Sequence, residues 1–512
     1  MLTKVYGAAV EGIDAIVITI EVNSSRGCSF YLVGLPDSAV KESHQRILSA
    51  LQTCNYKLPI TNTIVNMAPA YIKKEGSAYD LPIAIGLLAA NEMIVSDKLK
   101  SYIMMGELSL DGSILPIKGA LPIAIKAHEE HFEGLIVPKQ NVREAGVVNK
   151  LKVYGVSNIK EVIDFFIGKI ELEPTIVNTR KEFELKQTAF EYDFADVKGQ
   201  ENVKRALEVA AAGGHNLIMI GAPGSGKSMM AKRLPSILPP LSLQESLETT
   251  KIHSVAGKIK GETSLITTRP FRDPHHTISQ VAMVGGGNFP QPGEISLAHN
   301  GVLFLDELPE FNRSVLEVLR QPLEDRSISI SRIKYNIEYP AGFMLIASMN
   351  PCPCGYYNHP TKQCSCTPGQ VQKYLNKISG PLLDRVDIQI EIIPVPFDKI
   401  SDSRKGETSH SIRERVINAR KIQEDRYSAY PHVHCNAQIT AALIEKYVRL
   451  GKEELNRLKD AMDRFNLSAR AYTRILKVSR TIADLDNCEE INCSHIAEAI
   501  SYRNLDRENW AG

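Results

Sequence analysis

Cysteine is scarce in this chain, which has nine cysteines among 512 residues. That is too few for a scaffold held together by disulfides. Four of the nine lie within fifteen residues, from Cys352 to Cys366. Because the rest of the chain is poor in cysteine, this crowding indicates reduced thiols that serve a metal ion. We therefore expect a protein of the reducing cytoplasm.

Long apolar runs and a surplus of charge are also absent. A run of about eighteen apolar residues, which marks a membrane-spanning helix, occurs nowhere, so we expect no membrane partner. The N-terminus, Met1–Val5, passes directly into strand-like sequence without the charged start and apolar core of an export signal. The formal net charge is only +1, so any basic surface for a nucleic acid has to be local.

What the chain does have is length for about three domains and a hydrophobic content of 43%. Residues 1–170 mix strand and helix patterns. A β-branched run at 15–22 predicts a strand, and apolar residues at helical spacing follow a cap at Asp37 or Ser38. A second, apolar helix is predicted at 81–88, with a proline in its first turn.

Three further segments follow. Residues 171–190 are charged and weakly periodic, which predicts a linker. Residues 191–395 alternate strand and helix, which predicts a parallel sheet, and its buried strands are expected at 217–220, 302–305 and 341–347. Residues 396–512 are helical, with helices marked by Ile412–Ala419, Leu443–Val448, Ile475–Ile482 and Ile496–Ile500. The fold class is therefore a multidomain α/β protein with a C-terminal helical domain.

A glycine-rich loop between a predicted strand and a predicted helix is the strongest motif. It consists of Gly221, Ala222, Pro223, Gly224, Ser225, Gly226, Lys227 and Ser228. Glycine lets the backbone turn its N–H groups toward phosphate oxygens. Lys227 is expected to reach the β- and γ-phosphates, and the Ser228 hydroxyl to bind Mg²⁺. The motif predicts a P-loop that binds ATP with Mg²⁺.

Two carboxylates end an apolar strand about 80 residues after this loop, at Asp306 and Glu307. Asp306 is in the position to hold Mg²⁺, and Glu307 to polarise the attacking water as a general base. The alternative is an acidic strand end in solvent, which the P-loop upstream disfavours. The two motifs together predict ATP hydrolysis.

Three more polar residues fit the same reaction. Asn350 follows an apolar strand and can orient water against the γ-phosphate. Arg385 can reach the phosphate of a neighbouring subunit as an arginine finger, and Arg470 can contact the γ-phosphate from the helical region. Taken singly, each is better explained as a surface charge or a cap, so their weight comes from the motifs around them.

The order of these motifs resembles AAA+ ATPases with a helical lid. The stretches Arg269–Ser279, Gly293–Gly301 and Asn350–Gly355 resemble, more narrowly, the magnesium-chelatase-like YifB/ComM family. The resemblance implies that Asn350 is sensor 1, Arg385 the finger acting in trans and Arg470 sensor 2. It also implies a homo-oligomeric ring, expected to be a hexamer, and an adenine-side segment that includes Val197 and Gly199.

ComM-type members of this family are implicated in DNA branch migration during recombination and natural transformation. The resemblance therefore implies a DNA helicase or translocase acting on branched or single-stranded DNA. The alternative is a chelatase-like or protein-remodelling ATPase without a DNA substrate, because the ATP-site residues are the same in both. Basic candidates for DNA contact lie in an insertion at about 250–292 and in a hairpin-like strand at 327–334: Lys251, Lys258, Lys260, Arg269, Arg272, His275, His276 and Lys334.

The crowded cysteines form two C-x-C pairs separated by nine residues, Cys352 with Cys354 and Cys364 with Cys366. Four thiolates can form a closed tetrahedral Zn²⁺ site, although zinc ribbons usually use C-x₂₋₄-C. His359 lies inside the loop and can replace one ligand. The alternative is a set of reduced cysteines without metal. A metal here is expected to be structural, because the cluster follows Asn350 directly.

Residues 61–140 resemble the proteolytic domain of Lon, through Lys74–Asp80 and Gly106–Ile117. Lon uses a serine nucleophile activated by a lysine. The resemblance puts Ala78 at the serine position and Leu121 at the lysine position. Ser77 and Lys118 lie nearby but outside those positions. We therefore expect a domain that does not cleave peptides and that contacts DNA or builds the ring.

Overall fold

The structure, a computed structural model, describes residues 1–179, 183, 190–259, 263–287, 290–332, 335–395 and 406–503. Within these ranges the chain divides into two compact units, which we describe separately. The first comprises Met1–Lys186, Leu243–Thr267 and Pro290–Pro292, and the second Gln187–Ser242, Thr268–Phe289 and Gly293–Gly512. Some predicted features lie outside the described residues, namely 180–182 and 184–189 of the linker, Lys260, Lys334 and the boundary at 396.

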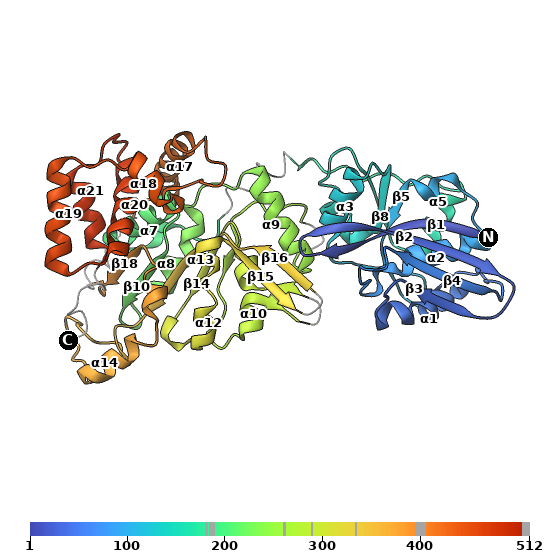
Figure 1. The fold of residues 1–512 in the computed structure, drawn as a ribbon, viewed down its shortest axis with the longest axis horizontal. Helices are drawn as coiled ribbons and strands as arrows, with labels where there is room; N and C mark the ends of the chain where they lie inside the picture. Colours follow the sequence, from blue (N-terminus) through green and yellow to red (C-terminus); the bar gives the residue numbers. More distant parts are fainter. Residues whose placement is uncertain are drawn as a thin grey trace. The chain divides into compact units, whose positions relative to one another are not determined.

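The first unit is built on a seven-stranded mixed sheet in the order β3-β4-β2-β1-β5-β8-β9 (Figure 1). The predicted strand at 15–22 is the centre of β2, and Ile18, Ile20 and Val22 are buried because alternate residues share one face. The strands are β1 Leu2–Glu11, β2 Asp14–Ser25, β3 Phe30–Val33, β4 Asn62–Ala68, β5 Tyr102–Met104, β8 Gly134–Pro138 and β9 Lys152–Val156, with a short hairpin of β6 Glu107–Leu108 and β7 Ile114–Leu115.

Two helices of the first unit correspond to the two that the sequence predicts there. Helix α1 (Ser38–Thr53) is capped by Asp37, whose carboxylate accepts a hydrogen bond from the backbone N–H of Val40 at 2.8 Å. Helix α2 (Asp80–Ala90) is buried along its whole length and packs on β1 and β2. The remaining helices are α3 Ala120–Glu129, α4 Val142–Ala145, α5 Ile159–Phe166 and α9 Leu243–Val255, and α9 packs on α3.

The second unit contains a five-stranded sheet in the order β11-β14-β17-β10-β18, with neighbouring strands parallel. The three predicted strands are confirmed as β10 (Leu217–Gly221), β14 (Val302–Leu305) and β17 (Met344–Met349), and all of their residues are buried. Such full burial is typical of strands that helices cover on both faces. The outer strands are β11 Phe271–Arg272 and β18 Ile388–Ile392.

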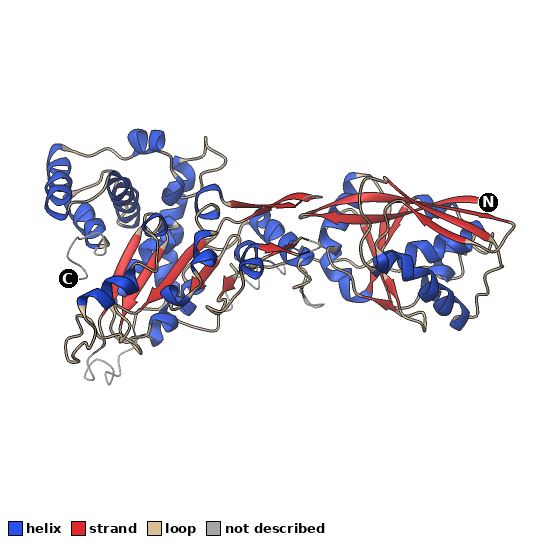
Figure 2. Ribbon diagram, turned by 60° about the horizontal axis from the view of Figure 1, so that its bottom comes forward, coloured by secondary structure: helices blue, strands red, loops and turns tan. Residues whose placement is uncertain are grey.

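Helices and hairpins complete the core of the second unit (Figure 2). Helix α7 (Glu201–Gly213) packs on β18, and α8 (Lys227–Arg233) packs on β10. The predicted hairpin is formed by β15 (Ser327–Arg332) and β16 (Tyr335–Pro340), whose Ile328 and Ile330 are buried. The shorter helices are α10 Gln280–Val284, α11 Glu294–Leu297, α12 Arg313–Glu317, α13 Pro322–Asp325, α14 Pro368–Leu375 and α15 Gly380–Leu383.

The C-terminal part of the second unit is helical, drawn in orange to red in Figure 1. The four predicted helices are confirmed, but the sequence did not predict α19, in which only Leu458 is buried. Its Leu455, Leu458, Met462 and Phe465 recur at helical spacing, so the sequence contained a periodic signal that the prediction overlooked. The helices are α17 Ser409–Arg426, α18 Ala441–Tyr447, α19 Lys452–Phe465, α20 Ala469–Leu485 and α21 Cys493–Ser501. Among the described helices, none is long and apolar enough to cross a lipid bilayer.

Candidate active site

The glycine-rich loop connects the carboxyl end of β10 to the first turn of α8. Gly224 and Gly226 have φ angles of 77° and 91°, in the left-handed region that favours glycine. Gly221 lies so close to β18 that a Cβ atom there would be 2.7 Å from the carbonyl oxygen of Ile392. The loop therefore needs glycine both for its turns and for its close packing, as a P-loop does.

Lys227 stands near the end of this loop, where α8 begins, and it is 8% exposed. Its Nζ donates to the carbonyl oxygens of Gly221 (2.7 Å) and Ala222 (3.0 Å), and to Oδ1 of Asn350 (3.2 Å). Burial lowers the pKa of Lys227, while the negative charges of Asp306 and Glu307 oppose that shift. The structure thus brings the predicted P-loop lysine and the predicted sensor asparagine together across two parallel strands.

Asp306 ends β14 and is held between two hydroxyl groups. Ser228 Oγ donates to Asp306 Oδ2 at 2.5 Å, and the hydroxyl of Ser348, at the end of β17, donates to Oδ1. Carboxylate and hydroxyl oxygens are the ligand types that Mg²⁺ prefers. The two residues expected to share the metal, Ser228 and Asp306, are therefore already in contact and suit a Mg²⁺ site.

Glu307 follows Asp306 in a left-handed conformation, with a φ of 54° that is uncommon outside glycine. Its backbone N–H donates to Asp306 Oδ1 (3.1 Å) and to Ser348 Oγ (3.4 Å). Its carboxylate Oε2 is 3.9 Å from Nδ1 of His276, and its side chain is 55% exposed. Backbone strain of this kind clusters at functional sites, and here it separates the two neighbouring carboxylates into different environments.

Sequence reasoning missed two residues of this site, Ser348 and His276. Ser348 is fully buried in an otherwise apolar strand, and a single polar residue there was a detectable signal, since buried polar groups need partners. His276 lies near Glu307 and has its ring against that of Phe311 at a centroid distance of 6.4 Å. The sequence offers His276 only as a candidate for DNA contact, because no local pattern connects this histidine to Glu307.

The segment expected to lie beside the adenine is bound to the P-loop helix and to the lid. Val197 is buried, and Gly199 has a φ of 66°. At the start of the segment, the Asp193 carboxylate accepts from the backbone N–H of Ser409 at 2.9 Å, while Arg233 donates to the Asp193 carbonyl at 2.9 Å. The segment therefore lies where α8 and α17 both contact it.

The two predicted arginines pair with groups outside the P-loop. The guanidinium of Arg385 contacts the Glu324 carboxylate and the carbonyl of Pro381. Arg470, whose side chain is 70% exposed, forms an ion pair with Asp384. The structure thus brings Arg470 beside the segment that carries Arg385, and joins neither of them to Lys227.

A buried polar network anchors that segment to the lid. Asp387 is bound by Arg474 of α20 at 2.8 Å and by the ring of His215 at 3.2 Å. Burial alone raises the pKa of Asp387, but Arg474 and His215 outweigh it, so the pKa falls below its usual value. The second ring nitrogen of His215 contacts Thr481 at 2.8 Å. The start of β18, the end of α7 and helix α20 are therefore held together by one set of polar contacts.

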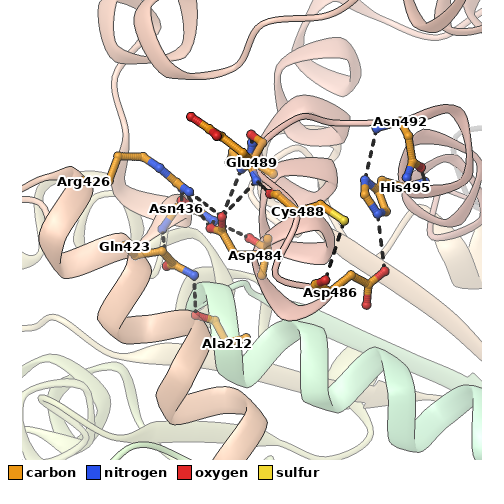
Figure 3. Close-up of polar contacts among 12 residues, drawn as sticks. Ala212, Gln423, Arg426, Asn436, Asp484, Asp486, Cys488, Glu489, Asn492 and His495 are labelled. Atoms are coloured by element: carbon orange, nitrogen blue, oxygen red, sulfur yellow. Dashed lines mark hydrogen bonds and ion pairs between the residues drawn. The ribbon is translucent and has the colours of Figure 1, made fainter.

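Inside the lid the network continues through Asp484 (Figure 3). Its carboxylate accepts from Arg426 of α17 (2.9 Å) and from the side-chain amide of Asn436 (2.8 Å). The Gln423 amide then donates to the carbonyl of Ala212 at 3.2 Å, which reaches helix α7 of the ATPase core. Because these groups are buried and paired, they fix α17 and α20 relative to α7.

The four cysteines meet in space. The Sγ of Cys352 is 3.3 Å from that of Cys354 and 3.7 Å from that of Cys364, and Cys354 and Cys364 are 3.5 Å apart. All four Sγ atoms, including that of Cys366, lie within 4.8 Å of one another, and all four are free thiols. His359 is outside the group, since its Nδ1 accepts from the backbone of the loop. The cluster therefore suits a metal ion held by four thiolates.

The basic residues of the insertion have mostly structural partners. Lys251 pairs with Asp14 at 2.9 Å inside the first unit. Arg269 donates to the carbonyl oxygens of Pro239 (2.7 Å) and Asn300 (2.8 Å). Arg272 forms a bidentate pair with Glu294 at 2.5 and 2.7 Å. These three cations hold the fold, which leaves Lys258, His275 and the hairpin as the better candidates for a ligand.

The Lon-like region of the first unit has neither protease group at the expected positions. Ala78 lies in a short 3₁₀ turn (Ser77–Tyr79), where its carbonyl accepts from Gly106 N at 2.8 Å. Leu121 is fully buried in α3, and its N–H donates to Glu144 at 3.1 Å. The side chain of Lys118 lies against Gly257, with Cε 2.9 Å from where a Cβ would be. The 243–267 segment thus packs beside Leu121, the position at which Lon has its catalytic lysine.

A P-loop at the end of one strand, a hydroxyl-bound aspartate at the end of another and a helical lid define an AAA+-type ATPase. Family comparison agrees along the chain: residues 193–400 match "Magnesium chelatase, subunit ChlI", 20–141 match "Subunit ChlI of Mg-chelatase" and 406–503 match the ChlI C-terminal family. The chain belongs to the magnesium-chelatase-like YifB/ComM family.

Two full-length relatives carry this assignment. YifB of Salmonella typhimurium is 43% identical over 510 residues, covering 99% of this chain and 98% of that protein. Competence protein ComM of Haemophilus influenzae is 43% identical over 513 residues, with the same two coverages. Lon protease 2 of Bacillus subtilis is 31% identical over 159 residues, which covers 28% of this chain and 27% of that protein. A likeness of part of this chain to Lon proteases is thereby shown.

Proposed function

We propose that this chain hydrolyses ATP and uses the energy as a ring-shaped motor on DNA. The observation that supports hydrolysis best is the contact of Ser228 and Ser348 with Asp306, next to the contact of Lys227 with Asn350. It puts a lysine, a metal-binding pair and a polar sensor at the carboxyl ends of three adjacent parallel strands, where ligands of such sheets bind.

Each residue then has one task. Lys227 turns its ammonium from the loop carbonyls to the β- and γ-phosphates, and Ser228 and Asp306 hold Mg²⁺, which neutralises the charge that develops on the phosphate oxygens. Glu307 accepts the proton of the attacking water, which Asn350 orients. We expect Lys227→Ala to abolish nucleotide binding or turnover. Normal turnover in that variant, measured by phosphate release, would exclude this site.

The ring is proposed from the family relationship, and the contacts of Arg385 support it. Those contacts lie with Glu324 and Pro381 and not with the P-loop of the same chain, which is consistent with a finger that serves the next subunit. Homo-oligomerisation, probed by mass photometry with ATP, is expected to give one closed species, a hexamer. Mixing inactive Arg385→Ala with inactive Glu307→Gln should restore part of the turnover, because some interfaces then pair an intact finger with an intact base. Absence of any recovery would argue against action in trans.

DNA is the proposed substrate because of the relationship to competence protein ComM. Backbone contacts by Lys and Arg are independent of base sequence and weaken steeply with salt. We expect single-stranded or branched DNA to stimulate the ATPase at low salt, and the purified protein to move a branch or displace a strand. A rate that ignores DNA, with no strand displacement, would favour the second candidate, a chelatase-like or protein-remodelling ATPase.

We further propose that the four cysteines bind one structural Zn²⁺ ion in the cytoplasm, where thiols stay reduced. In a tetrahedral site with Zn–S bonds of about 2.3 Å, neighbouring sulfurs lie about 3.8 Å apart, and the observed separations of 3.3–3.7 Å come close to this. Metal analysis of purified protein tests the assignment, with about one zinc per chain expected.

The Lon-like part is proposed to be a platform that contacts DNA or builds the ring and does not cleave peptides. Ala78 and Leu121 support this, because neither offers a nucleophile or a base. Peptidase activity that Ser77→Ala abolishes would overturn it.

A further inference from the structure

The four-cysteine loop touches the P-loop at both ends of one short segment, residues 350–355. At one end Asn350 Oδ1 accepts from Lys227 Nζ at 3.2 Å. At the other end Gly355 rests against Pro223, since a Cβ atom on Gly355 would be 2.5 Å from Cδ and 2.8 Å from Cγ of the proline ring. Gly355 also has a φ of 83°, so no other residue fits this place without strain.

The loop returns to the same segment after its second cysteine pair. Thr367 caps α14 through a reciprocal capping box, directly after Cys366. Near the end of α14, burial raises the pKa of the Tyr374 phenol, and the backbone N–H of Asn350, which lies close to it, opposes that shift. The chain thus leaves Asn350, passes the four thiols and comes back to Asn350, which makes a closed circuit next to the P-loop.

Apolar packing does little to hold this circuit. Between residues 351 and 367, only Pro351, Cys352 and Gly355 are buried. A short segment with so small a core does not keep one conformation by itself, and a bound metal supplies the missing cross-link.

The cysteines themselves are prepared for a metal. The backbone N–H of Cys366 donates to Cys364 Sγ at 3.4 Å, and the backbone N–H groups of Tyr356 and Ser365 lie near the Cys354 sulfur. Such N–H···S contacts orient thiolate ligands around a metal ion. With the sulfur separations above, the loop has the ligand set and the supporting hydrogen bonds of a structural zinc site.

We propose that zinc in the four-cysteine site controls nucleotide binding, by holding Gly355 against Pro223 and Asn350 beside Lys227. The inference rests on the proposed ATP and zinc sites. When the metal is lost, the loop that carries the cysteines is no longer cross-linked. Gly355 then loosens from Pro223, and Asn350 loosens from Lys227. The P-loop then samples more conformations, and nucleotide binding has to reorder them, which weakens affinity.

Metal content is the first measurement, made on the full chain purified under reducing conditions. We expect about one zinc per chain in the wild type and in Cys28→Ser, whose exposed cysteine lies outside the cluster. Cys364→Ser, which removes the sulfur that contacts both Cys352 and Cys354, should bind none. Cobalt should replace zinc and show the visible bands of a tetrahedral four-thiolate site. A wild type that neither contains nor takes up metal overturns the proposal.

Nucleotide affinity is the second measurement, with a fluorescent ATP analogue. Cys364→Ser should bind at least about tenfold more weakly than the wild type, whereas Cys28→Ser should match the wild type. Circular dichroism checks the fold, and if Cys364→Ser is misfolded, wild type stripped with a chelator should lose affinity and regain it when zinc returns. Unchanged affinity without metal overturns this proposal alone. A zinc-loaded wild type that binds no nucleotide refutes the proposed ATP function instead.

The third measurement tests the route from metal to nucleotide. Pro223→Ala removes the ring on which Gly355 rests and leaves the cysteine loop intact, so zinc content should stay at one per chain. In a double-mutant cycle with Cys364→Ser, the losses of affinity should be smaller together than their sum, because both variants break the same contact. Strictly additive losses would show that the contact between Gly355 and Pro223 does not carry the effect.

Discussion

Arg470 of the lid forms an ion pair with Asp384, the residue that immediately precedes Arg385. The pair connects, within one chain, the two arginines that we expect to act on the γ-phosphate at different subunit interfaces. Exposed pairs of this kind contribute about 0.2–1 kcal/mol, and the Arg470 side chain is 70% exposed. The contact is therefore weak enough for Arg470 to exchange Asp384 for a phosphate of a bound nucleotide.

Breaking this pair should change turnover more than stability. We expect Asp384→Asn to shift the free energy of unfolding by less than about 1 kcal/mol, because the pair is exposed. Arg470→Ala should lower kcat at least about tenfold, as loss of a charge on the transferring phosphate does. Steady-state kinetics and denaturant unfolding of both variants test this, with the exposed Asp325→Asn as control. A loss of several kcal/mol in stability without a kinetic effect would make the pair purely structural.

Glu307→Gln should bind ATP and fail to hydrolyse it. The amide keeps the shape of the side chain but cannot accept the proton of the attacking water, and loss of a general base lowers rates by about 10²–10⁴-fold. Nucleotide binding and phosphate release measure the two steps separately. Glu310→Gln is the matched control, since Glu310 lies three residues away and pairs with Lys377 on the surface. Near-normal turnover in Glu307→Gln would remove Glu307 as the base.

Ser348→Ala should raise the magnesium concentration that turnover needs. Its hydroxyl orients the Asp306 carboxylate without being placed on the metal itself, and loss of such a supporting group weakens metal affinity about 10–100-fold. At saturating Mg²⁺, Ser348→Ala should recover most of the wild-type turnover rate. Such recovery identifies Ser348 as a positioning residue, because loss of a catalytic group would lower the rate at any Mg²⁺ concentration. Ser428→Ala, an exposed serine on the lid, is the control. An unchanged magnesium dependence would contradict this role.

Acid should destabilise the second unit through His215. Burial lowers the pKa of this histidine, against its hydrogen bond to Asp387, and Lys477 and Arg474 lower it further. Below about pH 6.5 the unfolded chain therefore takes up a proton that the folded chain does not, so stability falls as the pH drops. His215→Gln should show a smaller drop in melting temperature between pH 7.5 and 5.5 than the wild type. The exposed His410→Gln should behave as the wild type; equal drops in all three would refute this source of acid sensitivity.

Much of the fold followed from local patterns. The three central strands of the ATPase sheet were evident as short apolar runs, since burial on both faces requires them. The cap at Asp37 was evident because its carboxylate satisfies a free N–H group of the first turn. The start of α8 at Lys227 was evident from the glycine-rich loop that precedes it. Helix α19 was missed although Leu455, Leu458, Met462 and Phe465 recur at helical spacing along it, so this error came from overlooking a pattern that the sequence contains.

By itself the sequence determined which functional groups the protein has: a P-loop, an Asp-Glu strand end and two cysteine pairs. Each of these is a contiguous stretch, so local spacing was enough to identify it. The tertiary structure alone decided which of these groups meet. Ser348 reaches Asp306, and Gly355 reaches Pro223, because strand order places β14, β17 and β10 side by side. It also decided that 243–267 belongs to the N-terminal unit. Such contacts join residues far apart in the chain, and no local pattern encodes them.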